Sequence, residues 1–133
     1  MFDQLSDRLQ GVLSDLRSRG KLLGVDADIT VDAGAYSVWP FTSCLESTMA
    51  ARHLPGPYAL PASRVRTSAV ATNQPPSVPY RGVAGTGICF AIELTIDAVA
   101  RAVGREACDV RRENLVPATA MPFVTVTGNA YDS

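Results

Sequence analysis

Residues 74–103 read QPPSVPYRGVAGTGICFAIELTIDAVARAV and decide the fold of the second half of the chain. Three prolines followed by three glycines exclude regular structure from residues 74–87, because proline lacks a backbone donor and glycine loosens the backbone. Residues 88–103 then carry isoleucine and valine at helical spacing, which predicts a helix. Its buried face is predicted to hold Ile92, Ile96, Val99 and Val103, and its other face a pair between Asp97 and Arg101.

The glycine-rich turn before this helix is the first candidate binding site. Amide groups at a helix N-terminus attract phosphate, and Arg81 adds a positive charge beside them. The Gly-Lys-Ser/Thr ending of a Walker loop and the G-x-G-x-x-G spacing of a dinucleotide fold are both absent. Two interpretations stay open for the turn, a phosphate contact and a tight connection into the helix. Arg81 is either held to stabilise developing negative charge or an ordinary surface arginine.

Two short strands are predicted upstream of this stretch. Residues 26–32 alternate apolar and polar side chains, and Gly34 ends the run. Residues 64–72 form the second such run, with Val65 and Val70 expected in the core.

Three further helices are predicted. Residues 43–52 form one, with Leu45, Met49 and Ala50 facing inward, and prolines after it impose an extended loop. Residues 108–114 form a short one. Residues 2–19 form an amphipathic helix with an apolar stripe of Phe2, Leu5, Leu9, Val12 and Leu16. Together these elements predict an α+β fold with short strands and two or three helices, preceded by the amphipathic helix.

The composition is that of one globular domain. The chain has 133 residues, of which 47% are apolar, and this suffices for a single core. The net charge of -1 supplies no global field that would hold nucleic acid or an anionic membrane. No apolar run approaches the roughly 20 residues of a transmembrane helix, and the acidic N-terminus is not typical of a secretory signal. We therefore expect a cytoplasmic protein that binds neither nucleic acid nor membrane.

The cysteines and the single histidine offer little catalytic chemistry. Cys44, Cys89 and Cys108 lack the spacing of a disulfide framework, a zinc site or an iron–sulfur site, and we expect buried single thiols. His53 would have to serve any Ser/His/Asp or Cys/His mechanism, but it ends a predicted helix just before a proline. A structural role for His53 is favoured, and no metal ligand set is predicted.

Four charged side chains on predicted helices are further candidates. Glu46 and Glu93 are each a possible carboxylate base, although isolated acids on helix surfaces are usually solvated. Arg111 and Arg112 are expected to pair with nearby acids or carbonyls.

Five motifs occur in one order along the chain: VDAGAYSVWP (residues 31–40), LPGPY (54–58), VATN (70–73), PYRGV (79–83) and VRRENLVP (110–117). Together they resemble the molybdenum-binding large subunit of the xanthine dehydrogenase, aldehyde oxidase and carbon monoxide dehydrogenase group. The resemblance covers residues 24–133.

This resemblance implies a molybdopterin-dependent oxidoreductase. The family hydroxylates small aldehydes or N-heterocycles at a molybdenum–molybdopterin cofactor, with oxygen from water. Its electrons pass to iron–sulfur and flavin subunits or domains, which would be the partners. By its match to the family motif, Arg81 is the catalytic arginine beside molybdenum. Tyr80, Gly82, Val83 and Gly85 are the matching cofactor-binding positions.

The chain departs from the family pattern at several points. After the arginine, family members read Gly-Val-Gly-Arg-Pro, whereas this chain has Gly82-Val-Ala-Gly-Thr-Gly. The copper-binding cysteine of the carbon monoxide branch is replaced by Gly82. The family's general-base glutamate and its upstream glycine-rich cofactor segment have no counterpart among the 133 residues. We therefore expect a fragment that is inactive alone and does not retain the cofactor by itself.

The first 22 residues, MFDQLSDRLQGVLSDLRSRGKL, instead resemble the opening helix of the signal recognition particle GTPase. The predicted organisation is an N-terminal amphipathic helix of different origin at residues 1–23 and a fragment of a molybdopterin-binding domain at residues 24–133. The alternative function is a non-catalytic binding or assembly module that uses the N-terminal helix.

Overall fold

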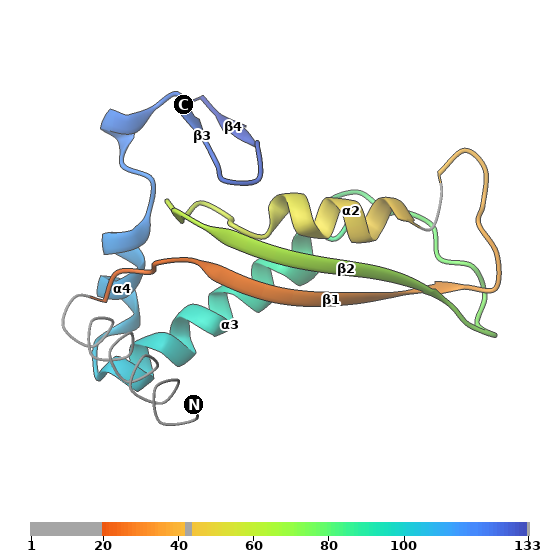
Figure 1. The fold of residues 1–133 in the computed structure, drawn as a ribbon, viewed down its shortest axis with the longest axis horizontal. Coiled ribbons are helices and arrows are strands. Elements are labelled where there is room, and N and C mark those ends of the chain that lie inside the picture. The colour runs from red at the N-terminus through yellow and green to blue at the C-terminus, as the bar shows by residue number, and fades with distance from the viewer. Residues whose placement is uncertain (1–19, 42–43, 133) are drawn as a thin grey trace, which may run out of the picture.

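A parallel β–α–β unit forms the centre of the molecule (Figure 1). The computed structural model describes residues 20–41 and 44–132. Strand β1 spans Val25–Gly34, helix α2 spans Cys44–His53 and strand β2 spans Ser63–Ala71. The two strands pair in parallel from Val25 opposite Ser63, with an irregularity between Asp32 and Gly34. A helical crossover is the usual way to connect parallel neighbours.

The rest of the described chain is helical and then irregular. Helix α3 spans Gly85–Val103 and helix α4 spans Ala107–Asn114. A short 3₁₀ helix, η1, spans Ala118–Ala120, and strands β3 (Phe123–Val124) and β4 (Ala130–Tyr131) form an antiparallel hairpin. The mixed helices and short strands confirm the predicted α+β class.

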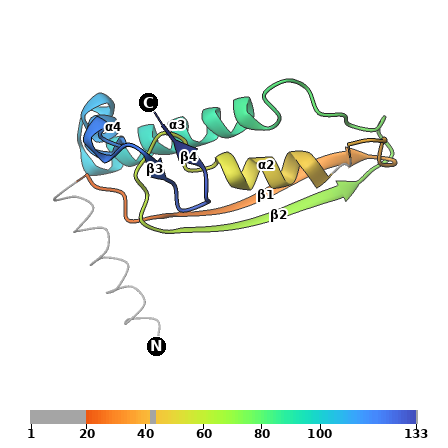
Figure 2. The same ribbon diagram turned by 90° about the horizontal axis from the view of Figure 1, so that it is seen from above.

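The sheet has one packed face and one polar face. Figure 2 shows α2 and α3 on the same side of β1 and β2. Ala50, Leu54 and Ile88 form a cluster on that side, with half-buried strand residues packed against it. On the other face Asp26 pairs with Arg64, and Asp28 pairs with Arg66 at 2.9 Å. Alternation along each strand therefore separates core from ion pairs, as the period of a β-strand requires.

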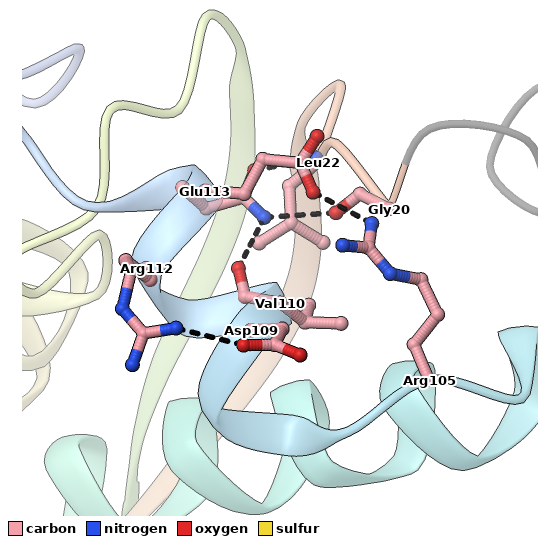
Figure 3. A network of polar contacts seen from close by, with 8 residues as sticks. Gly20, Leu22, Arg105, Asp109, Val110, Arg112 and Glu113 are labelled. Atoms are coloured by element: carbon pink, nitrogen blue, oxygen red, sulfur yellow. Dashed lines mark hydrogen bonds and ion pairs between the residues drawn. The ribbon is translucent and has the colours of Figure 1, made fainter.

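A second cluster joins α3 to α4 and to the N-terminal edge of the described chain. Its buried members are Leu22, Tyr58, Leu60, Ile92, Ile96, Ala100 and Val110. Asn114 closes this end: its side chain donates to the carbonyl oxygens of Gly20 (2.8 Å) and Val110 (2.7 Å) and accepts from the Leu22 amide (2.7 Å). Figure 3 shows this network between α4 and residues 20–22. The packed unit thus includes Gly20 and Leu22, which precede the predicted boundary at residue 24.

Several local predictions need correction. The long helix begins at Gly85 rather than Ile88. Asp97 pairs with Arg111 at 2.8 Å instead of with Arg101, because α4 packs against α3 and brings the guanidinium into reach. Val70 is 45% exposed, so it is not a core residue. The three cysteines are exposed rather than buried.

Other predictions agree with the structure or fall outside it. The strands at residues 26–32 and 64–72 and the helices at 43–52 and 108–114 are present with small shifts of their ends. Ala50 is buried as predicted, and Leu45 and Met49 are half-buried. The predicted helix at residues 2–19 lies outside the described residues. Among residues 20–41 and 44–132, no helix has both the length and the apolar character to span a bilayer.

Candidate functional site

The loops that follow β1 and β2 meet at one end of the sheet, on the right in Figure 1. The Ala35 amide donates to the Gln74 carbonyl at 3.0 Å, and the Ser77 amide donates to the Ala33 carbonyl at 3.2 Å. Gly34 has φ +74°, and a Cβ atom there would lie 2.4 Å from the Pro75 carbonyl oxygen. Only glycine fits this approach. The carboxyl ends of parallel strands are where open α/β sheets bind ligands.

A tight turn leads into α3 and lies beside the C-terminus of α2, away from the carboxyl end of the sheet. The Val83 amide donates to the Tyr80 carbonyl at 3.0 Å, and the Gly85 amide donates to the Gly82 carbonyl at 2.6 Å. Gly82 has φ +91° and Ala84 has φ +60°. The left-handed conformation is costly for alanine, which makes Ala84 an unusual residue at the start of a helix. These bonds and angles shape residues 80–85 into a compact bend.

The N-terminus of α3 is open. No side chain caps the helix at Ala84, so the free amides of its first turn have no side-chain acceptor. A Cβ atom added at Gly82 or at Gly87 would meet nothing within 4 Å. An anionic group can therefore approach the backbone closely here, where the helix dipole favours negative charge.

Arg81 and Tyr80 project from the turn. Both are exposed, with Tyr80 at 86%. Within the described part of the chain, the Arg81 side chain makes no hydrogen bond and no ion pair. Val83 and Gly85 are half-buried and belong to the turn itself. The structure thus gathers all five predicted site residues in one bend, with the guanidinium available to an incoming anion.

Aromatic side chains on the neighbouring loop were not predicted as part of a site. Tyr36, Trp39 and Phe41 follow β1 and are all exposed, Trp39 at 86%. Val78 on the second loop is exposed as well. The signal in the sequence was an aromatic run directly after a predicted strand.

Glu93 is a structural residue rather than a free base. It accepts hydrogen bonds from the Tyr58 hydroxyl (2.6 Å) and from Nε of Arg111 (2.6 Å). Burial and the bond to Glu93 raise the pKa of Tyr58 above its ordinary value. The bonds to Glu93 and Asp97 raise the pKa of Arg111. Arg111 therefore joins α4 to α3 through ion pairs with Glu93 and Asp97. Arg112 pairs with Asp109 at 2.7 Å, so both arginines pair with nearby acids as predicted.

Glu46 and His53 are the two remaining candidates, and the structure brings His53 to the turn. Glu46 lies in the first turn of α2, half-buried. His53 is the last residue of α2, also half-buried, and its Nδ1 atom lies 3.9 Å from the point that a Cβ of Gly85 would occupy. The sequence favoured a structural role for His53 because it ends a helix before a proline, and no local pattern indicates its approach to Gly85, 32 positions further along the chain.

An apolar cavity lies elsewhere. It has a volume of about 430 Å³ and is bounded by Leu115, Met121 and Tyr131 near the β3–β4 hairpin. None of the predicted site residues lines it. The positive charge of Arg81 and the open backbone therefore favour the turn over this cavity as the candidate site.

Comparison with known proteins gives a consistent picture. The family model described as "Molybdopterin cofactor-binding domain" matches residues 9–115. A probable xanthine dehydrogenase subunit of Bacillus subtilis is 32% identical over 96 residues, covering 72% of this chain and 12% of that protein. The nicotine 6-hydroxylase large subunit of Paenarthrobacter nicotinovorans is 31% identical over 116 residues, covering 86% of this chain and 14% of that protein.

A solved structure extends the match to the fold. Quinoline 2-oxidoreductase from Pseudomonas putida 86 superposes with a TM-score of 0.79 at 36% identity, over 86% of this chain and 14% of that chain. The chain thus spans about an eighth of the length of the relatives it matches.

Proposed function

The chain belongs to the molybdopterin cofactor-binding domain family, as the resemblance predicted, and on this basis we propose that residues 80–87 form one wall of its molybdenum–molybdopterin site. The observation that carries this proposal is the open, uncapped N-terminus of α3 beside Arg81, whose side chain is exposed and has no ion pair with residues 20–41 or 44–132. The cofactor is anionic through its phosphate and dithiolene, and this end of the helix offers backbone donors, positive charge and space. The residues present therefore fit the group.

Each residue of the turn has a distinct part in this proposal. The first-turn amides of α3 bind an anionic group of the cofactor, which approaches over Gly82 and Gly87 because neither carries a side chain. Arg81 stabilises negative charge on the cofactor or substrate. Tyr80 flanks the guanidinium, and Val83 and Gly85 hold the bend. When bound, the cofactor supplies the redox chemistry of hydroxylation.

The activity of the whole protein is proposed from its relatives. We propose hydroxylation of a small aldehyde or N-heterocycle in the cytoplasm, with electrons passed to iron–sulfur and flavin partners. The names nicotine 6-hydroxylase and xanthine dehydrogenase support this class. We also propose that the 133 residues alone are inactive, which their match to only 12–14% of those relatives supports. The different origin of residues 1–23 stays a proposal that rests on their own resemblance.

Two measurements test this function. The first is the molybdenum content of the purified chain, together with aldehyde or purine turnover using an artificial electron acceptor. Inactivity predicts no turnover, and stoichiometric metal with turnover would refute it.

The second measurement compares phosphate affinity by calorimetry in Arg81→Gln and Arg101→Gln. Both arginines are exposed, but Arg101 lies in the last turn of α3, away from the site. Loss of one charge-assisted bond should weaken phosphate binding roughly tenfold in Arg81→Gln only. Equal affinities in the two variants would exclude Arg81 from the site.

A second candidate function is an assembly module. Phe90 and Leu94 lie on the outer face of α3 and are 68% and 48% exposed. Both side chains are therefore available for apolar contacts with a partner. Sedimentation of the full chain against a variant starting at Gly20 tests whether residues 1–19 associate. The variant keeps Gly20 and Leu22 because both pack into the domain. Monomers in both cases would contradict the assembly role.

A further inference from the structure

We infer that His53 is a further ligand-contacting residue of the α3 turn, with its imidazole placed to hydrogen-bond an anionic group bound at the helix N-terminus. The inference rests on the proposed function of residues 80–87. Neither the sequence motifs nor the resemblance assigns a role to this histidine.

The first argument is the position of the imidazole. Its Nδ1 atom lies 3.9 Å from the Cβ position of Gly85, the first residue of α3. Cα–Cβ bonds in a helix tilt toward its N-terminus, so this point lies at the end of the helix, where the free amides emerge. Because residue 85 is glycine, no side chain stands between the imidazole and that end. The imidazole therefore lies beside the end of the helix from which the amides of Thr86 and Gly87 emerge.

The second argument is that the backbone that carries the ring is fixed by packing. His53 is half-buried, and its neighbour Leu54 is 4% exposed. Leu54 packs in one cluster with Ile88 of α3, and Ala84 of the turn packs against that cluster. The C-terminus of α2 and the start of α3 thus form one packed unit. The backbone that carries the imidazole is therefore fixed by packing, so little backbone entropy is lost when the imidazole meets a ligand.

The third argument is the hydrogen-bonding state of the surrounding groups. In residues 20–41 and 44–132, no hydrogen bond to the imidazole is present. On α2 the adjacent Arg52 bonds Asn129 at 2.6 Å, and Glu46 lies at the other end of the helix. On α3 the first carboxylate is Glu93, which Tyr58 and Arg111 already hold. The polar groups left for a ligand are His53, the first-turn amides and Arg81.

The test uses the full chain and inorganic pyrophosphate as the probe, at low salt. Because His53 is the only histidine, its ring resonances in a ¹H–¹³C spectrum are unambiguous. The amide resonances of Thr86 and Gly87 report binding at the helix end independently. The inference predicts that ring and amides shift with one dissociation constant. His53→Ala should weaken binding roughly three- to tenfold, the loss of one hydrogen bond, and His53→Asn should restore part of it.

Gly85→Ala is a structure-preserving companion variant. The added methyl would make an ordinary 3.9 Å contact with the imidazole, and φ at Gly85 is not in the left-handed region, so the fold is retained. The same methyl fills the space between ring and helix end, and affinity should fall as in His53→Ala. Arg101→Gln, in the last turn of α3 and away from the helix N-terminus, is the control that leaves the ring contact intact.

Two results would overturn the inference in distinguishable ways. If the Thr86 and Gly87 amides saturate while the His53 ring stays unshifted and His53→Ala binds as the wild type does, His53 is excluded and the proposed site survives. If pyrophosphate shifts neither the amides nor the ring, the proposed site fails as well.

Discussion

Replacing Asn114 with alanine should destabilise the domain far more than replacing an exposed residue of the same helix. Asn114 is 4% exposed, and its amide group satisfies two backbone groups outside the helix, the Gly20 carbonyl and the Leu22 amide. Alanine leaves both without a partner inside the protein. A buried polar group left unpaired costs about 1–3 kcal/mol, so the two together cost about 2–6 kcal/mol.

That loss is a large share of the free energy of unfolding, which for a domain is about 5–15 kcal/mol. It corresponds to a melting temperature lower by roughly 6–30 °C in a domain of this size. Urea unfolding followed by circular dichroism measures it directly. Arg112→Ala is the matched control: it lies in the same helix (Figure 3), and its ion pair with Asp109 is exposed. Exposed pairs contribute about 0–1 kcal/mol.

The reasoning would be refuted if Asn114→Ala and Arg112→Ala unfolded at the same urea concentration. Such a result would mean that residues 20–22 are not held by α4 and that the domain begins further along the chain.

Three other predictions concern the turn and the internal ion pairs. Gly82→Ala should lower the free energy of unfolding by about 1–2 kcal/mol, because φ +91° strains any residue with a Cβ. Gly87 does not have a positive φ, so Gly87→Ala should be neutral or stabilising. Equal melting temperatures of the two variants would contradict this prediction. Tyr58→Phe should remove part of the pH dependence of the free energy of unfolding. Burial and Glu93 raise the pKa of Tyr58, so the folded state holds the phenol proton more tightly than the unfolded state does. The stabilisation that results is complete below pH of about 10 and declines as pH rises above it. Urea midpoints across that range should therefore fall more steeply for the wild type than for the variant, and parallel curves would be the contrary result. Arg111→Met should lower the urea midpoint by the equivalent of about 1–3 kcal/mol, since it leaves the Glu93 carboxylate without its charged partner; an unchanged midpoint would show that the pair contributes nothing.

The sequence predicted the long helix well and one strand poorly, for identifiable reasons. Apolar spacing places Ile92 and Ile96 on one face of α3, and both are buried. Val65 and Val70 cannot share a face, because they are five positions apart and strand side chains alternate between the two faces. Val70 therefore lies on the outer face with Arg64 and Arg66, where it is exposed. The error came from counting apolar residues without their phase.

Contacts across long sequence separations account for the remaining differences. The turn at Arg81 is visible in the sequence because its prolines and glycines are local signals. The approach of His53 to Gly85 follows from the packing of α2 against α3, which no local pattern encodes. The partner of Asp97 is Arg111 for the same reason: tertiary packing of α4 overrides the i,i+4 pairing with Arg101.

The central claim is that the cofactor meets the chain at residues 80–87. Its most direct test is chemical-shift mapping of the ¹⁵N-labelled chain with isolated molybdopterin under nitrogen. The account predicts that the largest amide shifts fall between Arg81 and Ile88, with none in the β3–β4 hairpin. Largest shifts at the cavity by Leu115 and Tyr131, or no shifts between Arg81 and Ile88 at saturating cofactor, would contradict it.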